Sequence, residues 1–247
     1  MRPSPTVPTQ RHTRPTAPAP FPPLYPILDF ACVFPNGAPS PSQRWQHLRH
    51  LVQELAQAGV TLLQYRNKHD SDVLVAQDAL VVRDAASQAI REAVRNPAPS
   101  MKLILNDRPA LVAATRSDGV HVGQDDLSPA QARALAGPKA IIGVSTHTDE
   151  QVRLADLEPV DYIAIGPVFR TITKSDTSPI IGLAGVERAR ALTTKPLVAI
   201  GGITLENAAS VYDAGADSLA VISAIFGPRY GSTYSPAQAA REFLRIL

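Results

Sequence analysis

The sequence predicts a single (βα)8 barrel, an α/β fold also called a TIM barrel, preceded by a disordered N-terminal tail. Three observations lead to this prediction. The length of 247 residues suits one large α/β domain. Short runs of aliphatic and β-branched residues alternate with longer segments of helical period, which is typical of consecutive βα units. Polar residues follow nearly every run, as they do at the carboxyl ends of barrel strands.

Eight strands and eight helices are expected in alternation, and this number closes into a barrel. The expected strands are residues 24–28, 60–65, 102–106, 119–122, 140–144, 162–165, 197–200 and 218–222. The expected helices are residues 42–58, 70–95, 109–115, 128–136, 149–155, 183–192, 205–214 and 236–247. Ser42, Ser128 and Thr204 are suitable N-caps for three of these helices. Gly59 and Gly215 stand where a helix ends and turns into a strand.

Residues 1–23 differ from the rest of the chain, because they are dense in Pro, Thr and Arg and lack periodicity. We expect a disordered tail over this range and one barrel domain over residues 24–247. A transit peptide is the alternative, but the prolines oppose the amphipathic helix that such peptides need.

The charge and composition of the chain limit its partners and location. The tail carries three arginines and no acid, so the remaining residues have a formal charge of +2 minus +3, or −1, and we expect no nucleic-acid partner. No apolar run approaches the roughly 20 residues of a membrane span, so we expect no membrane association. The single cysteine, Cys32, reads as a structural residue and suits the reducing cytoplasm. Whether the chain forms a homo-oligomer stays open.

The second expected strand ends in the polar run Gln64-Tyr65-Arg66-Asn67-Lys68. The period of two along a strand points Gln64, Arg66 and Lys68 to one side, which would be the mouth of the barrel. Two cations and an amide at one place suit a polyanion such as a phosphate group. A solvated charged loop is the alternative interpretation.

Carboxylates follow the third and fourth expected strands. Asp107 and Asp126 come from adjacent strands, and together they could hold a Mg²⁺ ion that also binds substrate phosphates. The alternative is that they act as helix N-caps or first-turn acids. For His121 and His147 we favour a hydrogen-bonded structural role over direct catalysis.

The last strands are followed by loops suited to a second anion. Thr171, Thr173 and Lys174 lie on a long loop after the sixth strand. Gly201-Gly202-Ile203-Thr204 and Ile222-Ser223-Ala224 follow the seventh and eighth strands, where barrels often bind phosphate through backbone N–H groups. Two anion sites suggest two substrates.

Seven motifs in order make the sequence resemble the thiamine-phosphate synthase family from Leu24 to the C-terminus. The motifs are QYRNK (64–68), LNDRPA (105–110), DGVHVGQDDL (118–127), GVSTHT (143–148), GPVFRTITKSD (166–176), AIGGIT (199–204) and GADSLAVISAI (215–225). The resemblance implies a transferase of thiamine biosynthesis. It would join a hydroxymethylpyrimidine diphosphate to a thiazole phosphate with Mg²⁺, giving thiamine phosphate and pyrophosphate.

The resemblance also implies roles for individual residues. The metal would be held by Asp107 and Asp126, and the groups that assist the reaction would be Arg66, Lys68, Ser145 and Lys174. The pyrimidine diphosphate would contact Gln64, Tyr65, Arg66, Asn67, Lys68, Asn106 and Ser145. The thiazole phosphate would contact Thr171, Ile172, Thr173, Gly202, Ile222 and Ser223, and Lys174 would meet the departing pyrophosphate.

The family mechanism is dissociative and needs no protein nucleophile, which agrees with the lack of a convincing triad or acid/base pair in the sequence. This chain departs from the family at Asn67, where many relatives have an acid, and in the tail and residues 31–41. Three alternatives stay open. They are a thiazole tautomerase with the same barrel, a catalytically silent barrel that senses a thiamine precursor, and another phosphate-binding barrel of amino-acid or sugar metabolism.

Overall fold

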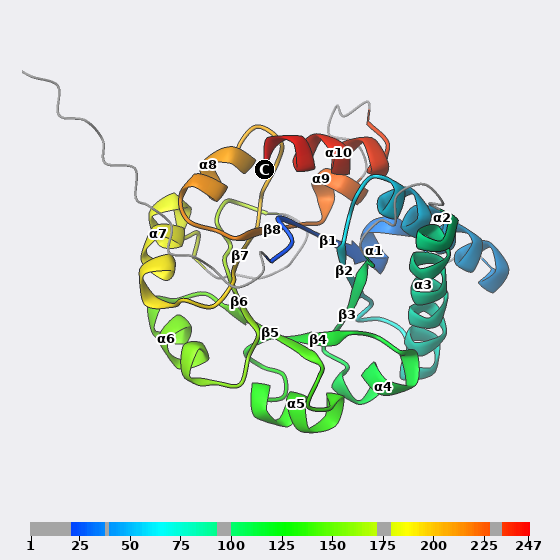
Figure 1. Cartoon of the computed structure of the whole chain (residues 1–247), viewed down its shortest axis with the longest axis horizontal. Coiled ribbons are helices and arrows are strands. Elements are labelled where there is room, and N and C mark those ends of the chain that lie inside the picture. The colour runs from blue at the N-terminus through cyan, green and yellow to red at the C-terminus, as the bar shows by residue number, and fades with distance from the viewer. Residues whose placement is uncertain (1–20, 38–39, 93–99, 172–178, 228–233) are drawn as a thin grey trace, which may run out of the picture.

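The computed structural model describes residues 21–37, 40–92, 100–171, 179–227 and 234–247. Eight parallel strands form a closed barrel in which each strand pairs with its neighbours in the sequence and β8 pairs with β1. Helices surround the barrel (Figure 1). The (βα)8 fold class predicted from the sequence is therefore confirmed.

All eight expected strands are present, with ends that shift by at most two residues. They are β1 Leu24–Asp29, β2 Leu62–Arg66, β3 Lys102–Asn106, β4 Gly119–Val122, β5 Ile141–Thr146, β6 Tyr162–Ile165, β7 Leu197–Ile200 and β8 Ser218–Val221. The described structure begins at Phe21, before the expected start of the barrel at Leu24. The ring of Phe21 packs on that of Tyr162, and the Pro23 carbonyl accepts a hydrogen bond from Leu219 N.

The helices follow the expected order, with two short additions after β1 and β8. They are α1 Phe30–Val33, α2 Pro41–Gln57, α3 Asp72–Glu92, the 3-10 turn η1 Pro109–Leu111, α4 Val112–Thr115, α5 Pro129–Ala136, α6 Asp149–Leu157, α7 Gly182–Leu192, α8 Ala208–Asp213, α9 Ser223–Phe226 and α10 Pro236–Ile246. Four-residue helices such as α1 and α9 are too short to show a helical period in a sequence.

Of the three predicted N-caps, only Ser128 is correct. Its hydroxyl accepts a hydrogen bond from Gln131 N in a capping box. The prediction of Ser42 is wrong because Pro41 occupies the first turn of α2, which makes Ser40 the N-cap. The prediction of Thr204 is wrong because residues 204–207 form a turn, and α8 begins only after Asn207.

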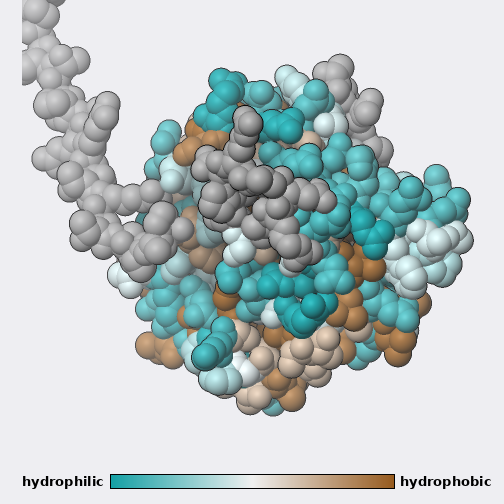
Figure 2. Space-filling view, turned by 45° about the vertical axis from the view of Figure 1, so that its right-hand side comes forward, coloured by the Kyte–Doolittle hydropathy of each residue, from teal (hydrophilic) through white to brown (hydrophobic). Residues whose placement is uncertain are grey.

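Two apolar layers hold the barrel together. Side chains that alternate along the strands fill the interior, among them Tyr25, Ile27, Leu62, Ile104, Tyr162, Ala164 and Val198. The opposite faces of the same strands pack against the helices, so most strand residues are buried. On the face drawn in Figure 2, hydrophobic areas are separated by hydrophilic side chains. Among the described residues, no helix has both the length and the apolar character needed to cross a membrane.

Candidate active site

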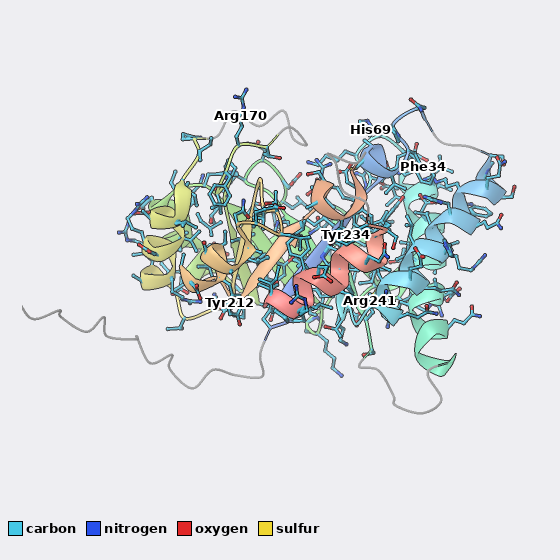
Figure 3. All side chains as sticks on the ribbon, turned by 90° about the horizontal axis from the view of Figure 1, so that it is seen from above. Phe34, His69, Arg170, Tyr212, Tyr234 and Arg241 are labelled. Carbon is cyan, nitrogen blue, oxygen red and sulfur yellow. The ribbon has the colours of Figure 1, made fainter. Side chains whose placement is uncertain are left out.

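The polar residues that follow the strands gather at one end of the barrel. Arg170 and His69, which follow β6 and β2, point out on the same side of the molecule, opposite Tyr212 and Arg241 (Figure 3). The strand register brings partners from adjacent strands together at this end, with Asp29 beside Arg66 and Asn106 beside His121. The barrel mouth is therefore a polar surface, as the sequence predicts.

Arg66 is held at the mouth by a partner that sequence reasoning missed. Its Nη1 forms an ion pair with Oδ2 of Asp29, a carboxylate that is only 3% exposed. The other oxygen of Asp29 accepts a hydrogen bond from Cys32 N at 3.1 Å and caps α1. The buried Arg66 Nε has no hydrogen-bond partner among the described residues, so it can donate to a ligand. The sequence signal for this partner was the carboxylate of Asp29 at the end of the first strand.

Lys68 and the two predicted metal carboxylates form one cluster. Lys68 Nζ lies 2.9 Å from Oδ2 of Asp107, whose carboxyl group is hydrogen-bonded to that of Asp126. Asp126 also accepts a hydrogen bond from Gly123 N at 2.8 Å. Asp107 has a left-handed backbone with φ of 59°, which is uncommon outside glycine and typical of functional sites. The structure therefore brings into contact the two carboxylates that the sequence predicts as metal ligands.

The contact between the carboxylates moves their pKa values apart. Burial, with the neighbouring Asp126, raises the pKa of Asp107. Burial acts in the same direction on Asp126, but its hydrogen bonds to Asp107 and to the Gly123 amide lower the pKa of Asp126 overall. Two adjacent carboxylates form a donor set that suits a hard divalent cation, whose charge would relieve their mutual repulsion. Within the described ranges, no group of three or more His, Cys, Asp and Glu side chains is placed so that it could hold a metal.

The amides of Gln64 and Asn106 lie beside this cluster in different surroundings. Gln64 points into the barrel, and its Nε2 donates to the hydroxyl of Tyr25 at 2.9 Å. Asn106 Nδ2 is buried and has no hydrogen-bond partner among the described residues. Leaving a buried donor unpaired costs about 1–3 kcal/mol, so this atom is suited to a ligand.

The side chains of Tyr65 and Asn67 point away from the mouth, because alternate residues of a strand face opposite sides. The Tyr65 hydroxyl donates to Asp78 of α3, and Asn67 Nδ2 donates to Asp70 at 2.9 Å. Asn67 Oδ1 accepts hydrogen bonds from the amides of His69 and Asp70. These two predicted binding residues therefore hold the loop that carries Lys68, and any contact with a ligand would come from their backbone.

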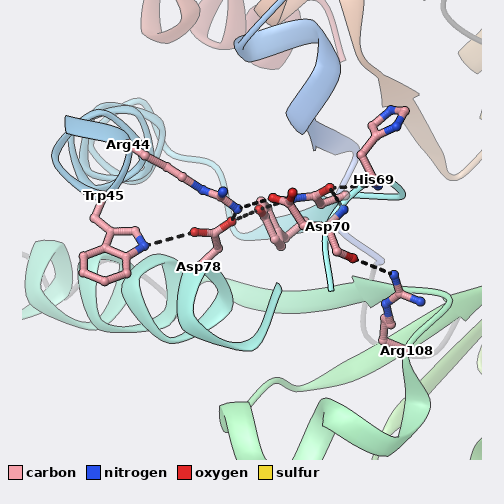
Figure 4. Close-up of polar contacts among 8 residues, drawn as sticks. Arg44, Trp45, His69, Asp70, Asp78 and Arg108 are labelled. Carbon is pink, nitrogen blue, oxygen red and sulfur yellow. Dashed lines mark hydrogen bonds and ion pairs between the residues drawn. The ribbon is translucent and has the colours of Figure 1, made fainter. Parts of the chain in front are cut away.

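A buried ion pair supports the same loop (Figure 4). Arg44 of α2 pairs with Asp78 and, at 2.8 Å, with Asp70. Trp45 Nε1 donates to Asp78 at 3.1 Å. Arg44 and Asp78 are 5% and 1% exposed, so helices α2 and α3 and the loop after β2 are tied together where water is excluded.

A pocket lies over the ends of β5 to β8. It is lined by five of the predicted site residues, which are Ser145, Thr171, Gly202, Ile222 and Ser223. Other lining residues that sequence reasoning did not assign to a ligand include Thr146, Gly166, Pro167 and Ile200. His147 and Gly201, which the sequence analysis had considered, line the pocket as well. Ile172, Thr173 and Lys174, which are also predicted site residues, lie outside the described residues.

Glycines give this pocket its backbone surface. Gly201 and Gly202 have φ of 104° and 65°, conformations that favour glycine. A Cβ at Gly201 would lie 2.7 Å from Pro167 Cα, and one at Gly202 would lie 2.5 Å from the Arg170 carbonyl oxygen. The segment after β6 therefore packs directly on the glycine pair.

Hydrogen bonds hold this contact in place. Val168 N donates to the Ile200 carbonyl and Phe169 N to the Gly201 carbonyl, each at 2.9 Å. On the other side, Asn207 Nδ2 donates to the Gly202 carbonyl at 3.0 Å. These main-chain hydrogen bonds fix the position of the glycine pair that lines the pocket.

Both histidines near the mouth are hydrogen-bonded, as the sequence favoured. His121 is 8% exposed and lies 2.8 Å from Ser145 Oγ and 2.9 Å from the Tyr162 hydroxyl. His147 Nδ1 lies 2.6 Å from the Gly166 carbonyl oxygen and donates to it. Ser145 thus joins the buried interior to the pocket.

Comparison with known proteins gives the relatives of this chain. The family model described as thiamine monophosphate synthase matches residues 39–225. The thiamine-phosphate synthase of Koribacter versatilis is 48% identical over 92% of this chain and 96% of its own length. That of Chloroflexus aurantiacus is 41% identical over 72% of this chain and 77% of its own.

A solved structure shows the same likeness in three dimensions. The thiamine phosphate pyrophosphorylase of Pyrococcus furiosus superposes with a TM-score of 0.73 and 27% identity, covering 91% of this chain and 94% of its own. Because the family model spans most of the chain, and because the barrel, the carboxylate pair and the glycine pocket lie where the motifs predict them, the chain belongs to the thiamine monophosphate synthase family of transferases.

Proposed function

We propose that this protein joins a hydroxymethylpyrimidine diphosphate to a thiazole phosphate, giving thiamine phosphate and pyrophosphate. The observation that carries the proposal is the pairing of two different anion sites at one barrel mouth. One is a charged cluster on β2 to β4 with Arg66, Lys68 and the carboxylates. The other is the backbone pocket over β5 to β8. Ser145 lines the second site and lies one strand away from the first.

The charged cluster would hold the diphosphate. Asp107 and Asp126 would bind Mg²⁺, which supplies positive charge to the leaving pyrophosphate when it is bound. Arg66 and Lys68 would neutralise the remaining phosphate oxygens, since both side chains are already fixed by carboxylate partners. The unpaired Asn106 Nδ2 would donate to the pyrimidine or its diphosphate. Lys174 would meet the departing group.

The backbone pocket would hold the thiazole phosphate. Gly201, Gly202 and Ser223 line this pocket, and their backbone amides would donate to the phosphate oxygens. The Thr171 side chain lines the same pocket and would add a hydroxyl. The predicted contacts of Ile172 and Thr173 extend this site.

The reaction would proceed by departure and then capture. The bond between the pyrimidine methylene carbon and the diphosphate oxygen breaks, and its electron pair leaves with pyrophosphate. The lone pair of the thiazole nitrogen then forms the new carbon–nitrogen bond to the resulting cation. The protein contributes charge neutralisation and alignment of the two substrates, and it needs no covalent nucleophile.

The direct test incubates the purified full chain with both substrates and Mg²⁺ and measures thiamine phosphate and pyrophosphate. We expect both products in equal amounts, and none when either substrate or the metal is omitted. Asp107→Ala should abolish turnover while circular dichroism shows an intact fold. Asp125→Ala is the matched control, because that carboxylate belongs to the same DGVHVGQDDL motif but not to the described cluster. Absence of both products from the wild-type protein would refute the proposal.

A further inference from the structure

A continuous chain of hydrogen bonds crosses the interior of the barrel below the mouth. Gln64 Nε2 donates to the hydroxyl of Tyr25 at 2.9 Å, and that hydroxyl lies 2.9 Å from the hydroxyl of Tyr162. The Tyr162 hydroxyl lies 2.9 Å from His121 Nδ1. His121 Nε2 lies 2.8 Å from Ser145 Oγ. The chain thus joins β2 to β5 through side chains of β1, β6 and β4.

The surroundings of this chain are dry and apolar. Gln64, Tyr25 and Tyr162 are 2%, 1% and 0% exposed. The apolar neighbours in the same interior cluster include Ile27, Leu62, Ile104, Ala164 and Val198. Burial raises the pKa of both tyrosines; at Tyr25 it outweighs the hydrogen bonds, and at Tyr162 the hydrogen bond to Tyr25 acts in the same direction, so both keep their protons at neutral pH. Each hydroxyl is therefore a hydrogen-bond donor that needs one acceptor, and a buried donor without an acceptor costs about 1–3 kcal/mol.

These requirements set the direction of every hydrogen bond. The Gln64 amide donates to Tyr25, whose only other polar partner in the described structure is the Tyr162 hydroxyl. Tyr25 must then donate to Tyr162, and Tyr162 must donate to His121 Nδ1. The opposite direction would leave the Tyr25 proton buried without an acceptor.

His121 extends this order of donors and acceptors to Ser145 at the mouth. A neutral imidazole that accepts at Nδ1 carries its proton on Nε2. That proton points at Ser145 Oγ. Because the serine oxygen accepts this bond, its own proton turns away from the barrel interior. Ser145 lines the pocket over β5 to β8, so the proton is available to a ligand there.

We propose that Tyr162 and His121 are positioning residues that fix the Ser145 hydroxyl as a hydrogen-bond donor to an anionic oxygen of the bound substrate. Tyr25 donates to Tyr162 and so excludes the opposite direction of the chain. Without the chain, Ser145 could equally donate to His121 and present only an acceptor, which would repel a phosphate oxygen. The inference rests on the proposed function for the identity of the ligand, but the tautomer of His121 follows from the fold alone.

The tautomer is measured by nitrogen NMR on full-length protein labelled with ¹⁵N-histidine. His121→Asn identifies the His121 signals by their loss. We expect a neutral ring with protonated Nε2 and unprotonated Nδ1, and no change of tautomer in Tyr25→Phe, because Tyr162 can still donate. Tyr162→Phe should move the Nδ1 resonance, since it removes the donor. A ring protonated on Nδ1, or on both nitrogens, would overturn the proposal.

A double-mutant cycle tests whether the chain acts through Ser145. We expect Tyr162→Phe to lower kcat/KM about tenfold in the wild-type background, the size of one directed hydrogen bond. In the Ser145→Ala background the same change should have almost no further effect. An equal loss in both backgrounds would overturn the proposal.

A buried hydroxyl outside the chain supplies the control for this cycle. Thr115 is fully buried, and its Oγ1 donates to the Leu111 carbonyl at 2.8 Å, away from the mouth. Thr115→Val should lower the thermal midpoint but leave kcat/KM unchanged in both backgrounds. The NMR result does not depend on turnover, so failure of the proposed function and failure of this inference give different outcomes.

Discussion

The guanidinium of Arg66, at the end of β2, forms an ion pair with the buried carboxylate of Asp29 at the end of β1. The ion pair orients the Arg66 guanidinium at the mouth, so Asp29→Asn should weaken the alignment of Arg66 without removing the Arg66 side chain. We expect the KM for the pyrimidine diphosphate to rise about tenfold, as for a lost charged hydrogen bond, with little change in the KM for the thiazole phosphate.

Asp161→Asn is a matched control for Asp29→Asn. Asp161 also accepts from one arginine and one backbone amide, Arg133 at 2.6 Å and Ile142 N at 2.8 Å, but it precedes β6 at the other end of the barrel. Asp161→Asn should leave the KM for the pyrimidine diphosphate and the KM for the thiazole phosphate unchanged. Equal effects of the two substitutions on steady-state kinetics would contradict the role of Asp29.

The buried pair of Arg44 and Asp78 should dominate the stability of the α2 and α3 side of the barrel. Asp78→Ala leaves the Arg44 charge buried with only Asp70 nearby and removes the partner of Tyr65. Breaking such a pair from one side costs about 3–5 kcal/mol of unfolding free energy.

The exposed pair of Arg116 and Asp84 provides the comparison, because its side chains are 61% and 63% exposed. Asp84→Ala should change the unfolding free energy by no more than about 1 kcal/mol. Urea denaturation of both variants measures the difference. A loss for Asp78→Ala as small as that for Asp84→Ala would show that the buried network carries little stability.

Gly201→Ala should damage the pocket over β5 to β8 specifically. Its φ of 104° disfavours alanine, and the new Cβ would lie 2.7 Å from Pro167 Cα. Gly137→Ala is the control, since its φ of 99° is nearly the same but nothing lies within 4 Å. Each change should cost about 1–3 kcal/mol of stability from backbone strain. Only Gly201→Ala should raise the KM for the thiazole phosphate, and a rise in both would point to general destabilisation instead.

Cys32 should react slowly at neutral pH, because burial and the charge of Asp29 raise its pKa from 9.0 to about 11. The stability linked to this shift is present below the unfolded pKa and is lost as the pH rises from 9.0 toward 11. Alkylation by iodoacetamide, followed by mass spectrometry across this pH range, checks the value. The denatured chain should react with a midpoint near 9.0, and a folded midpoint at or below that value would contradict the shift.

Local patterns in the sequence were sufficient for the strands and for much of the site. The period of two correctly placed Gln64 and Arg66 on one side of β2, because side-chain direction in a strand is a local property; Lys68 lies beyond the end of this strand. Ser128 was recognisable as an N-cap for the same reason, since its partner Gln131 stands three positions away.

The features that the sequence did not reveal depend on contacts between distant segments. Tyr25 and Tyr162 are 137 positions apart, so their hydrogen bond leaves no trace in any local window. The partner of Arg66 likewise becomes visible only once the register of β1 and β2 is known. The hydrogen bonds of Asn67 to Asp70 and to the His69 amide, which hold the loop after β2, were likewise not foreseen.

The packing of Gly201 and Gly202 against the segment after β6 has a consequence for how such a barrel can diverge. Their positive φ and the lack of room for a Cβ leave these positions little freedom to change, whereas a few substitutions can alter the side-chain cluster on β2 to β4. A descendant of this gene could therefore keep the binding of one phosphorylated substrate while acquiring a new second substrate. The two halves of the mouth would then evolve at different speeds within one domain.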